Sequence, residues 1–184
     1  MIETEESMPP QSYPRAYSAA HFALEIANQP SGFVRSVEGG GIKAEVLDHK
    51  VGGQPGAWRQ LSRPKYDDIK LSVGMSMAPD FYTWIEAFFS GKGTRKSGAI
   101  VAGDFQYRER SRREFMDAII SELTFPALDA TDRNACTMGI TLAPERVAYV
   151  KGESQPLSRF VGSMRQKLWT PANFVLSIDG LEAA

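Results

Sequence analysis

The sequence contains a single cysteine, Cys136, and only two histidines, His21 and His49. One cysteine excludes an internal disulfide framework and every zinc site built from several cysteines. The two histidines are not spaced as metal ligands usually are, either relative to each other or relative to Cys136. We therefore expect no metal and no cofactor. Nothing nearby marks Cys136 as an activated thiol, and its apolar, strand-like setting predicts a small core residue. Without a recognisable set of nucleophile, base and orienting group, the chain is not expected to be an enzyme.

A strong net charge and a long apolar run are missing as well. The 21 Lys and Arg residues nearly balance the 22 Asp and Glu residues, so no overall field attracts nucleic acid or anionic lipid. No stretch approaches the roughly 20 apolar residues that span a bilayer as a helix, which predicts a soluble protein without membrane anchoring. Residues 1–16 lack the basic and then apolar order of a signal peptide, and we expect a mobile N-terminal arm there.

Alternation of apolar and polar residues predicts several β-strands. Phe22, Leu24 and Ile26 share one face of an extended segment, and residues 69–75 alternate without interruption. Further extended segments are expected over 33–37, 42–49, 99–105, 114–125 and 136–142, with 108–113 as a charged turn.

The period changes once, between Pro79 and Gly91. Phe81, Trp84, Ile85 and Phe88 follow the i, i+3, i+4, i+7 spacing of an amphipathic helix, which Pro79 and Gly91 suit as start and end. One short helix among short strands predicts a mainly β fold: a sandwich or barrel of two packed antiparallel sheets with one flanking α-helix.

Two glycine-rich segments stand outside these elements. Residues 50–64 have Trp58 and Leu61 as their largest apolar residues, and they predict a long loop or a projecting hairpin. Residues 91–98 invite comparison with a phosphate-binding loop. They lack the first glycine of that motif and follow a helix instead of a strand, so we interpret them as a turn at the helix end.

The strongest basic cluster consists of Arg108, Arg110, Arg112 and Arg113. Alternation in a hairpin would place three of these arginines on one face, where they could contact a nucleic-acid backbone or an acidic neighbouring subunit. We favour a solvated turn, because charge runs of this kind usually lie on the surface.

Several short motifs follow one another along residues 17–149. They are Phe22-Ala-Leu-Glu-Ile26, Gly52-Gly53, Arg59-Gln-Leu61, Lys65-Tyr66-Asp-Asp-Ile69-Lys-Leu71, Gly74, Trp84-Ile85, Gly91, Arg95-Lys96-Ser-Gly98, and Pro126 with Leu128-Asp129-Ala130. In this order they resemble the tail-tube proteins of contractile phages and extracellular injection systems, which are related to the tube protein of type VI secretion. Leu61-Ser-Arg-Pro64 stands where the family has a Leu-Pro-Gly turn.

The resemblance implies a tail-tube-like β domain over residues 17–151 that closes, in six copies, into a ring around a central channel. Rings then stack into a tube, with the protein itself, sheath proteins and baseplate or cap proteins as partners, and with nucleic acid or cargo only as a passenger. Segment 50–64 matches the family's projecting hairpin. It implies a contact loop between rings or subunits formed by Gly52, Gly53, Trp58, Arg59 and Leu61. The subunit would wait in the cytoplasm of the producing cell and then enter a virion tail or injection particle.

Residues 152–184 depart from the family pattern. They comprise a polar linker with Pro156, a basic amphipathic stretch over 160–169, and a strand-like segment over 173–180 that is similar to residues 21–26. The extension could begin a second domain, add a strand to a neighbour, or be a simple terminal extension. It raises the alternative of a specialised initiator, terminator or adaptor of the tube. A different function, a monomeric β-barrel that binds a small ligand or nucleic acid through residues 108–113, also remains open.

Overall fold

A computed structural model describes residues 21–50, 57–157, 170–175 and 177. The expected N-terminal arm, the glycine pair Gly52 and Gly53, and the basic stretch over 160–169 lie outside these residues. None of the described helices is long and apolar enough to cross a membrane.

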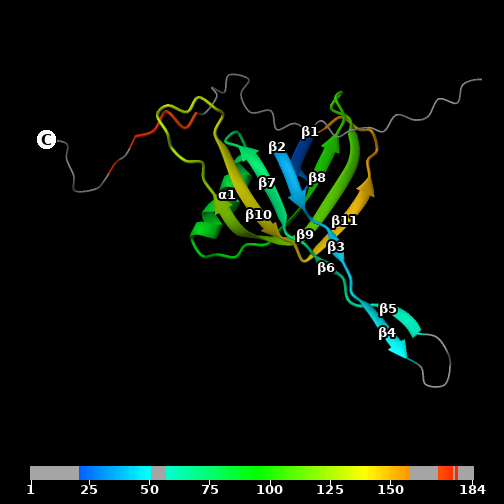
Figure 1. Cartoon of the computed structure of the whole chain (residues 1–184). Coiled ribbons are helices and arrows are strands. Elements are labelled where there is room, and N and C mark those ends of the chain that lie inside the picture. Colours follow the sequence, from blue (N-terminus) through cyan, green and yellow to red (C-terminus); the bar gives the residue numbers. More distant parts are fainter. Residues whose placement is uncertain (1–20, 51–56, 158–169, 176, 178–184) are drawn as a thin grey trace, which may run out of the picture.

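Seven strands form one antiparallel sheet in the order β10-β7-β2-β1-β8-β9-β11 (Figure 1). They are β1 (His21–Ile26), β2 (Gln29–Gly39), β7 (Ile69–Gly74), β8 (Lys96–Gly103), β9 (Glu109–Thr124), β10 (Thr137–Ala143) and β11 (Arg146–Lys151). The second half of β9 also pairs with β10, from Ile119 opposite Ala143 to Thr124 opposite Gly139. This pairing closes the sheet into a barrel, so the predicted β fold is confirmed in its barrel form.

The core follows from the alternation read in the sequence. Leu24 and Ile26 of β1 and Ile69, Leu71 and Val73 of β7 point into the barrel, where each is at most 3% exposed. They join residues of the other strands in one continuous apolar cluster. Because successive side chains of a strand point to opposite faces, a period of two identifies the inner wall directly.

The predicted helix is α1 (Pro79–Phe89). Its buried face consists of Phe81, Trp84 and Ile85, which belong to the barrel core. The indole Nε1 of Trp84 donates a hydrogen bond of 2.8 Å to the carbonyl oxygen of Thr94. A buried indole N–H needs such a partner, so this bond fixes the turn after the helix as well as the ring.

The prediction of a charged turn over residues 108–113 is wrong. The turn covers Asp104–Arg108, and β9 already begins at Glu109. The carboxylate of Asp104 accepts hydrogen bonds from the backbone N–H groups of Gln106 (2.9 Å) and Arg108 (3.0 Å). These hydrogen bonds lower the pKa of Asp104, and the bond from the Arg108 N–H has the largest effect. The guanidinium of Arg110 lowers this pKa as well.

Polar residues of β9 line the outer face of the barrel, where an ion-pair network replaces apolar packing. Arg112 contacts Glu25 of β1 at 2.6 Å and Glu109 of its own strand at 3.1 Å. Both carboxylates are largely buried, and their hydrogen bonds, that of Glu109 foremost, raise the pKa of Arg112 above its usual value. A strand with this pattern looks like a turn in the sequence because partners such as Glu25 lie far away along the chain.

The first residues after β11 pack on the barrel and do not form the predicted linker. The N–H of Gly152 bonds to the carbonyl of Arg110 (3.0 Å), and the N–H of Leu157 bonds to that of Tyr107 (2.7 Å). Leu157 is 5% exposed and completes a small apolar cluster on the outer face, with Ala23, Ala99 and Val101. Of the strand expected over 173–180, the described residues 173–175 and 177 belong to no strand.

Four short strands leave the barrel as an extension, which we call the projecting hairpin (residues 42–66). Its base pairs β3 (Ile42–Lys43) with β6 (Lys65–Tyr66), and its outer part pairs β4 (Val46–Lys50) with β5 (Ala57–Leu61). The expected single strand over 42–49 is therefore interrupted, and the expected projecting hairpin over 50–64 is confirmed by the β4–β5 pair. Figure 1 shows it pointing away from the barrel.

Candidate functional site

The projecting hairpin begins at a glycine run. Gly39 and Gly40 have φ angles of 77° and 68°, in the left-handed region that glycine adopts at little cost. The N–H of Gly40 bonds to the carbonyl oxygen of Asp68 (3.0 Å), and a β-carbon at Gly39 would overlap that same oxygen. The two segments that connect the hairpin to the barrel can therefore run side by side, because Gly39 lacks a side chain.

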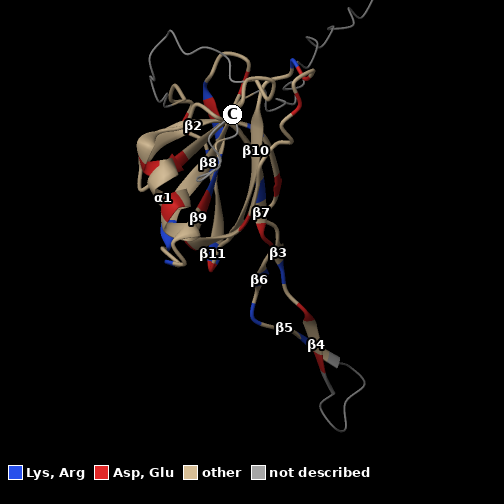
Figure 2. Ribbon diagram, turned by 90° about the vertical axis from the view of Figure 1, so that its left-hand side faces the viewer, with Lys and Arg blue, Asp and Glu red and all other residues tan. Residues whose placement is uncertain are grey.

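The base of the hairpin is held by exposed ion pairs. Lys43 contacts Asp67 at 3.0 Å, and Lys65 contacts Glu45 at 3.3 Å. Figure 2 shows these alternating charges along the extension. Exposed pairs of this kind contribute at most about 1 kcal/mol each, so they orient the hairpin more than they stabilise it.

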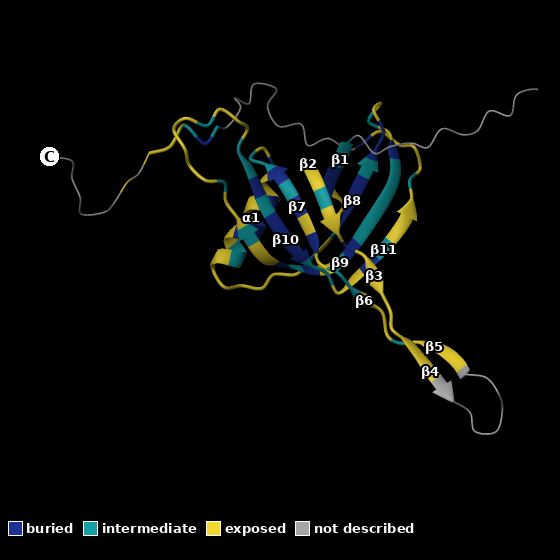
Figure 3. Cartoon of the chain, in the orientation of Figure 1, coloured by how far each residue is buried: buried dark blue, intermediate teal, exposed yellow. Residues whose placement is uncertain are grey.

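The outer part of the hairpin exposes apolar side chains on both of its faces. Val46 lies directly opposite Leu61 on one face, and these residues are 56% and 69% exposed. On the other face lie Leu47 and Trp58, which are 44% and 77% exposed. Figure 3 shows the described parts of the outer strands β4 and β5 as exposed. A two-stranded hairpin is marginally stable alone, and apolar surface of this kind marks a contact site.

Two more apolar surfaces lie on the barrel itself. Phe89, just at the end of α1, stacks on Phe125 with ring centroids 6.1 Å apart, although these rings are 64% and 53% exposed. Tyr149 of β11 is 71% exposed, and β11 pairs along one edge only within the described residues. These two surfaces lie on opposite sides of the barrel in Figure 1, beside α1 and along β11.

The structure locates three residues of the predicted contact loop, whose contact role stays a prediction. Trp58, Arg59 and Leu61 are neighbours on β5, with Arg59 paired to Asp48 at 3.3 Å across the hairpin. Gly52 and Gly53 lie outside the described residues. The structure therefore places three of the five predicted residues together on the hairpin.

The structure does not bring the four predicted basic residues together in one charged surface. These residues are Arg108, Arg110, Arg112 and Arg113. Two nitrogens of Arg110 bond to the Asp104 carboxylate, at 2.9 and 2.7 Å. Arg113 points to the other side of β9, where it donates to the carbonyl oxygen of Gly39 (2.7 Å). Alternation along a strand separates neighbouring arginines, and carboxylates or carbonyls of the same chain bind the side chains.

The prediction that Cys136 lies in the core is wrong. It is partly exposed and immediately precedes β10, where it lines a groove at one end of the barrel. Within the described part of the chain, no group of three or more His, Cys, Asp or Glu residues is arranged to hold a metal ion.

Sequence reasoning missed the second apolar face of the hairpin and the Phe89–Phe125 stack. Val46 and Leu47 are adjacent, so they must point to opposite faces of any strand that contains both. Phe89 follows Phe88 and leaves the buried stripe of α1. Each signal was present as an apolar residue outside the expected period.

Comparison with known proteins places these surfaces in context. The sequence-family model described as T4-like virus tail tube protein gp19 matches residues 18–148. No curated protein sequence matches the chain.

Solved structures from contractile injection machines have a similar fold. The tube terminating cap of the anti-feeding prophage is 20% identical, with a TM-score of 0.59, and the match covers 83% of this chain and 100% of that one. A chain of the sheath-tube complex of an extracellular contractile injection system, PVC, is 18% identical, with a TM-score of 0.60, over 79% and 99% of the two chains. The sheath/tube terminator of PVC is 19% identical, with a TM-score of 0.59, and the match covers 76% of this chain and 99% of that one. At these identities the similarity shows the fold.

Proposed function

This chain belongs to the family of the T4-like virus tail tube protein gp19, and we propose that six copies close into a ring and that rings stack into a hollow tube. In this role the protein is a structural subunit of a contractile tail or injection machine. The family consists of tube proteins, and we propose a function in assembly without catalysis. Before assembly the subunit resides in the cytoplasm of the producing cell.

The observation that carries this proposal is the apolar surface on both faces of the projecting hairpin. Val46 and Leu61 on one face, and Leu47 and Trp58 on the other, are all more than two-fifths exposed. A hairpin that lies flat on one surface would bury only one of these faces. Insertion between neighbouring subunits buries both, which is the arrangement that stacked rings provide.

Closure of the ring needs two different surfaces on opposite sides of each subunit. In a head-to-tail ring, each copy is related to the next by the same rotation. One surface of each copy therefore contacts a different surface of the next copy. The Phe89–Phe125 stack and the exposed edge of β11 meet this requirement. We propose that the β11 edge faces the next subunit of the ring, which also covers a strand edge that is unpaired among the described residues.

The position of this subunit in its machine is a finer question. The solved relatives are described as tube, tube terminator and tube terminating cap. Sheath proteins, and baseplate or cap proteins, are the proposed partners besides further copies of this chain. The extension after residue 151 favours a specialised position at a tube end as the alternative to the main repeating subunit.

Electron microscopy of the purified protein, with its solution mass measured over a range of concentrations, tests the proposal. We expect rings of six copies that convert into hollow tubes as the concentration rises. A chain that stays monomeric at all concentrations, alone and with its sheath and baseplate proteins, would contradict the assembly role.

A further inference from the structure

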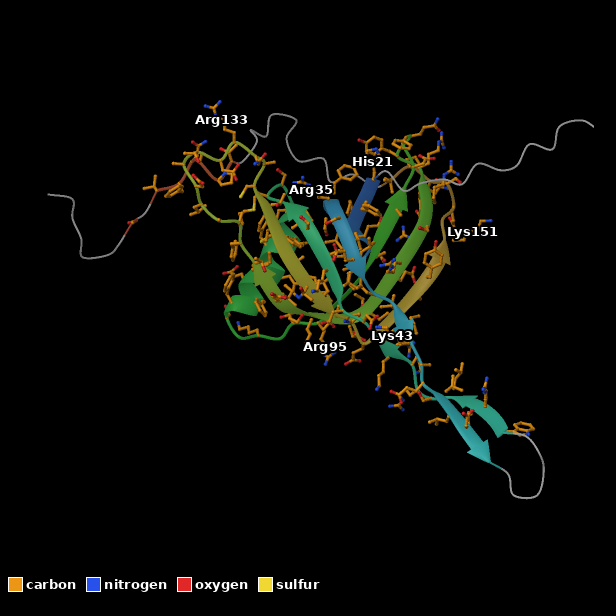
Figure 4. All side chains as sticks on the ribbon, in the orientation of Figure 1. His21, Arg35, Lys43, Arg95, Arg133 and Lys151 are labelled. Carbon is orange, nitrogen blue, oxygen red and sulfur yellow. The ribbon has the colours of Figure 1, made fainter. Side chains whose placement is uncertain are left out.

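A groove of about 520 Å³ opens at the end of the barrel far from the projecting hairpin. It is lined by Phe33, Val34, Arg35, Gly74, Asn134, Ala135, Cys136 and Thr137. Strand register fixes its place, because Val34 lies opposite Val73 at this end of the β2–β7 pair, whereas Gly39 lies opposite Ile69 at the other. The hairpin leaves from the Gly39 end. Figure 4 shows the same separation, with Arg35 at the upper rim and Lys43 at the base of the hairpin.

The groove is apolar at its base and open above. Val34 is buried, and Phe33 is 41% exposed, with its ring edge-on to Tyr107 at 5.8 Å. A β-carbon added to Gly74 would meet no heavy atom within 4 Å, so this wall leaves free space. Among the described residues that line the groove, Arg35 is the only charged one. A volume of this size lies within the usual range of sites that enclose a large organic group.

The hairpin offers a group of that kind. Trp58 and Leu47 project from one face of the β4–β5 pair, where the indole is 77% exposed. Trp is among the residues most enriched at the energetically dominant positions of protein interfaces, where it is buried at the centre of the contact. The hairpin extends away from the barrel at the end opposite the groove (Figure 1), so it cannot reach the groove of its own subunit.

We propose that the groove receives the projecting hairpin of a second copy of this chain, with Trp58 against Phe33. This inference rests on the proposed function and names the acceptor surface for the stacking contact. The hairpin and the groove lie at opposite ends of one subunit, so a contact between them repeats in one direction and joins ring to ring.

The single cysteine of the chain provides the test, because Cys136 lines the groove. A Gln60→Cys variant places a second thiol on the Trp58 face of the hairpin while keeping the indole. Treatment of assembled protein with a short bismaleimide is expected to link position 60 of one subunit to Cys136 of another, giving dimers and longer ladders. Mass spectrometry of the linked peptides identifies the pair.

Two matched controls keep the result specific. Arg59→Cys places the thiol one residue away on the opposite face of the hairpin, and we expect a several-fold lower yield of links to Cys136. Gln60→Cys combined with Cys136→Ser is expected to form no ladder. If Arg59→Cys links as efficiently as Gln60→Cys, or if the links form within single subunits, the proposed orientation is wrong.

A second variant tests the groove without cross-linking. Phe33→Ala is expected to raise the concentration needed for tube formation by about tenfold or more, the effect of removing an interface anchor. Phe105→Ala removes a ring that is 76% exposed and does not line the groove, and it should leave that concentration unchanged.

The outcomes separate this inference from the proposed function. Tubes that form without links to Cys136, and that tolerate Phe33→Ala, would overturn the acceptor site and leave the tube role standing. A Cys136 that does not react with maleimide in the monomer would also overturn it, since another segment would already cover the groove. Linked pairs in a protein that never forms rings or tubes would support the docking contact and contradict the tube role.

Discussion

The barrel and the projecting hairpin are built from the same strand geometry but bury their apolar residues in different ways. In the barrel, residues such as Leu24, Ile69 and Leu142 are completely buried by other strands of the same chain. In the hairpin, Leu61 and Trp58 are more than two-thirds exposed, and within the described chain their strand β5 pairs only with β4. The barrel is stabilised within the monomer, whereas in the proposed tube the hairpin gains most of its burial from a neighbour.

Two tryptophans provide the strongest test of this difference. Trp84→Ala removes a buried ring, and we expect it to lower the free energy of unfolding by about 3–5 kcal/mol. Trp58→Ala should change the stability of the monomer by less than about 0.5 kcal/mol, as exposed positions usually do, yet weaken stacking of rings. Urea unfolding of the monomer, followed by circular dichroism, measures the first effect, and electron microscopy measures the second. A monomer that unfolds on losing Trp58 would place this ring in the core.

Two arginines sharpen the comparison for charged groups. Arg112→Ala leaves the buried carboxylates of Glu25 and Glu109 without their cation, at an expected cost of about 2–3 kcal/mol. This cost lies below that of a fully buried pair because the Arg112 side chain is 24% exposed. Arg59→Ala breaks the exposed pair with Asp48 and should cost less than about 1 kcal/mol. Equal effects of the two changes in urea unfolding would show that the outer-face network contributes no more than a surface pair.

Glycine substitutions test where the barrel ends. A β-carbon at Gly152 would lie 2.5 Å from the carbonyl carbon of Arg110, so Gly152→Ala must displace the segment that carries Leu157. We expect a loss of about 1–3 kcal/mol, the usual range for overpacking. Gly93→Ala meets no heavy atom within 4 Å and is the matched control, expected to be neutral within about 0.5 kcal/mol. If both variants unfold at the same urea concentration, residues 152–157 are not part of the cooperative unit.

The smallest expected effect concerns the dependence of stability on pH. The pKa of Asp104 is lowered in the folded state, so its contribution to stability is present above the ordinary Asp value of about 4 and is lost as the pH falls below it. Asp104→Asn should therefore make the decrease in stability on acidification shallower. Asp48→Asn, in the hairpin, serves as the control and should leave the slope unchanged. Unfolding curves at several pH values down to the acid limit of folding provide the slopes.

The sequence allowed the barrel strands and the helix to be predicted because their signals are local. Ile69, Leu71 and Val73 alternate within one strand, and Phe81, Trp84 and Ile85 follow one helical face. Closure of the barrel was not visible, since it depends on β9 being long enough to pair with β10 beyond the end of β11. The short strand β11 was not predicted either.

The charged start of β9 was misread for a physical reason. Arg112 bonds to the nearby Glu109 and also to Glu25, 87 residues earlier in the chain, and this distant partner cannot be recognised from the sequence. The hairpin could be predicted from its family resemblance and from Trp58, but its two apolar faces follow from strand register. The groove could not be predicted, because β2, β7 and residues 134–137 meet only in the fold.

The long strand β9 has a mechanical consequence. It is bonded along one edge to β8 and along the other first to β11 and then to β10. A force along this strand loads the ladders in shear, so many hydrogen bonds must break together before β9 can slide. Peeling a strand from an open sheet edge, by contrast, breaks its bonds one pair at a time. A subunit built around such a strand resists a pull along β9 as a stiff body, and in the proposed tube its hairpin and flanks hold it to its neighbours.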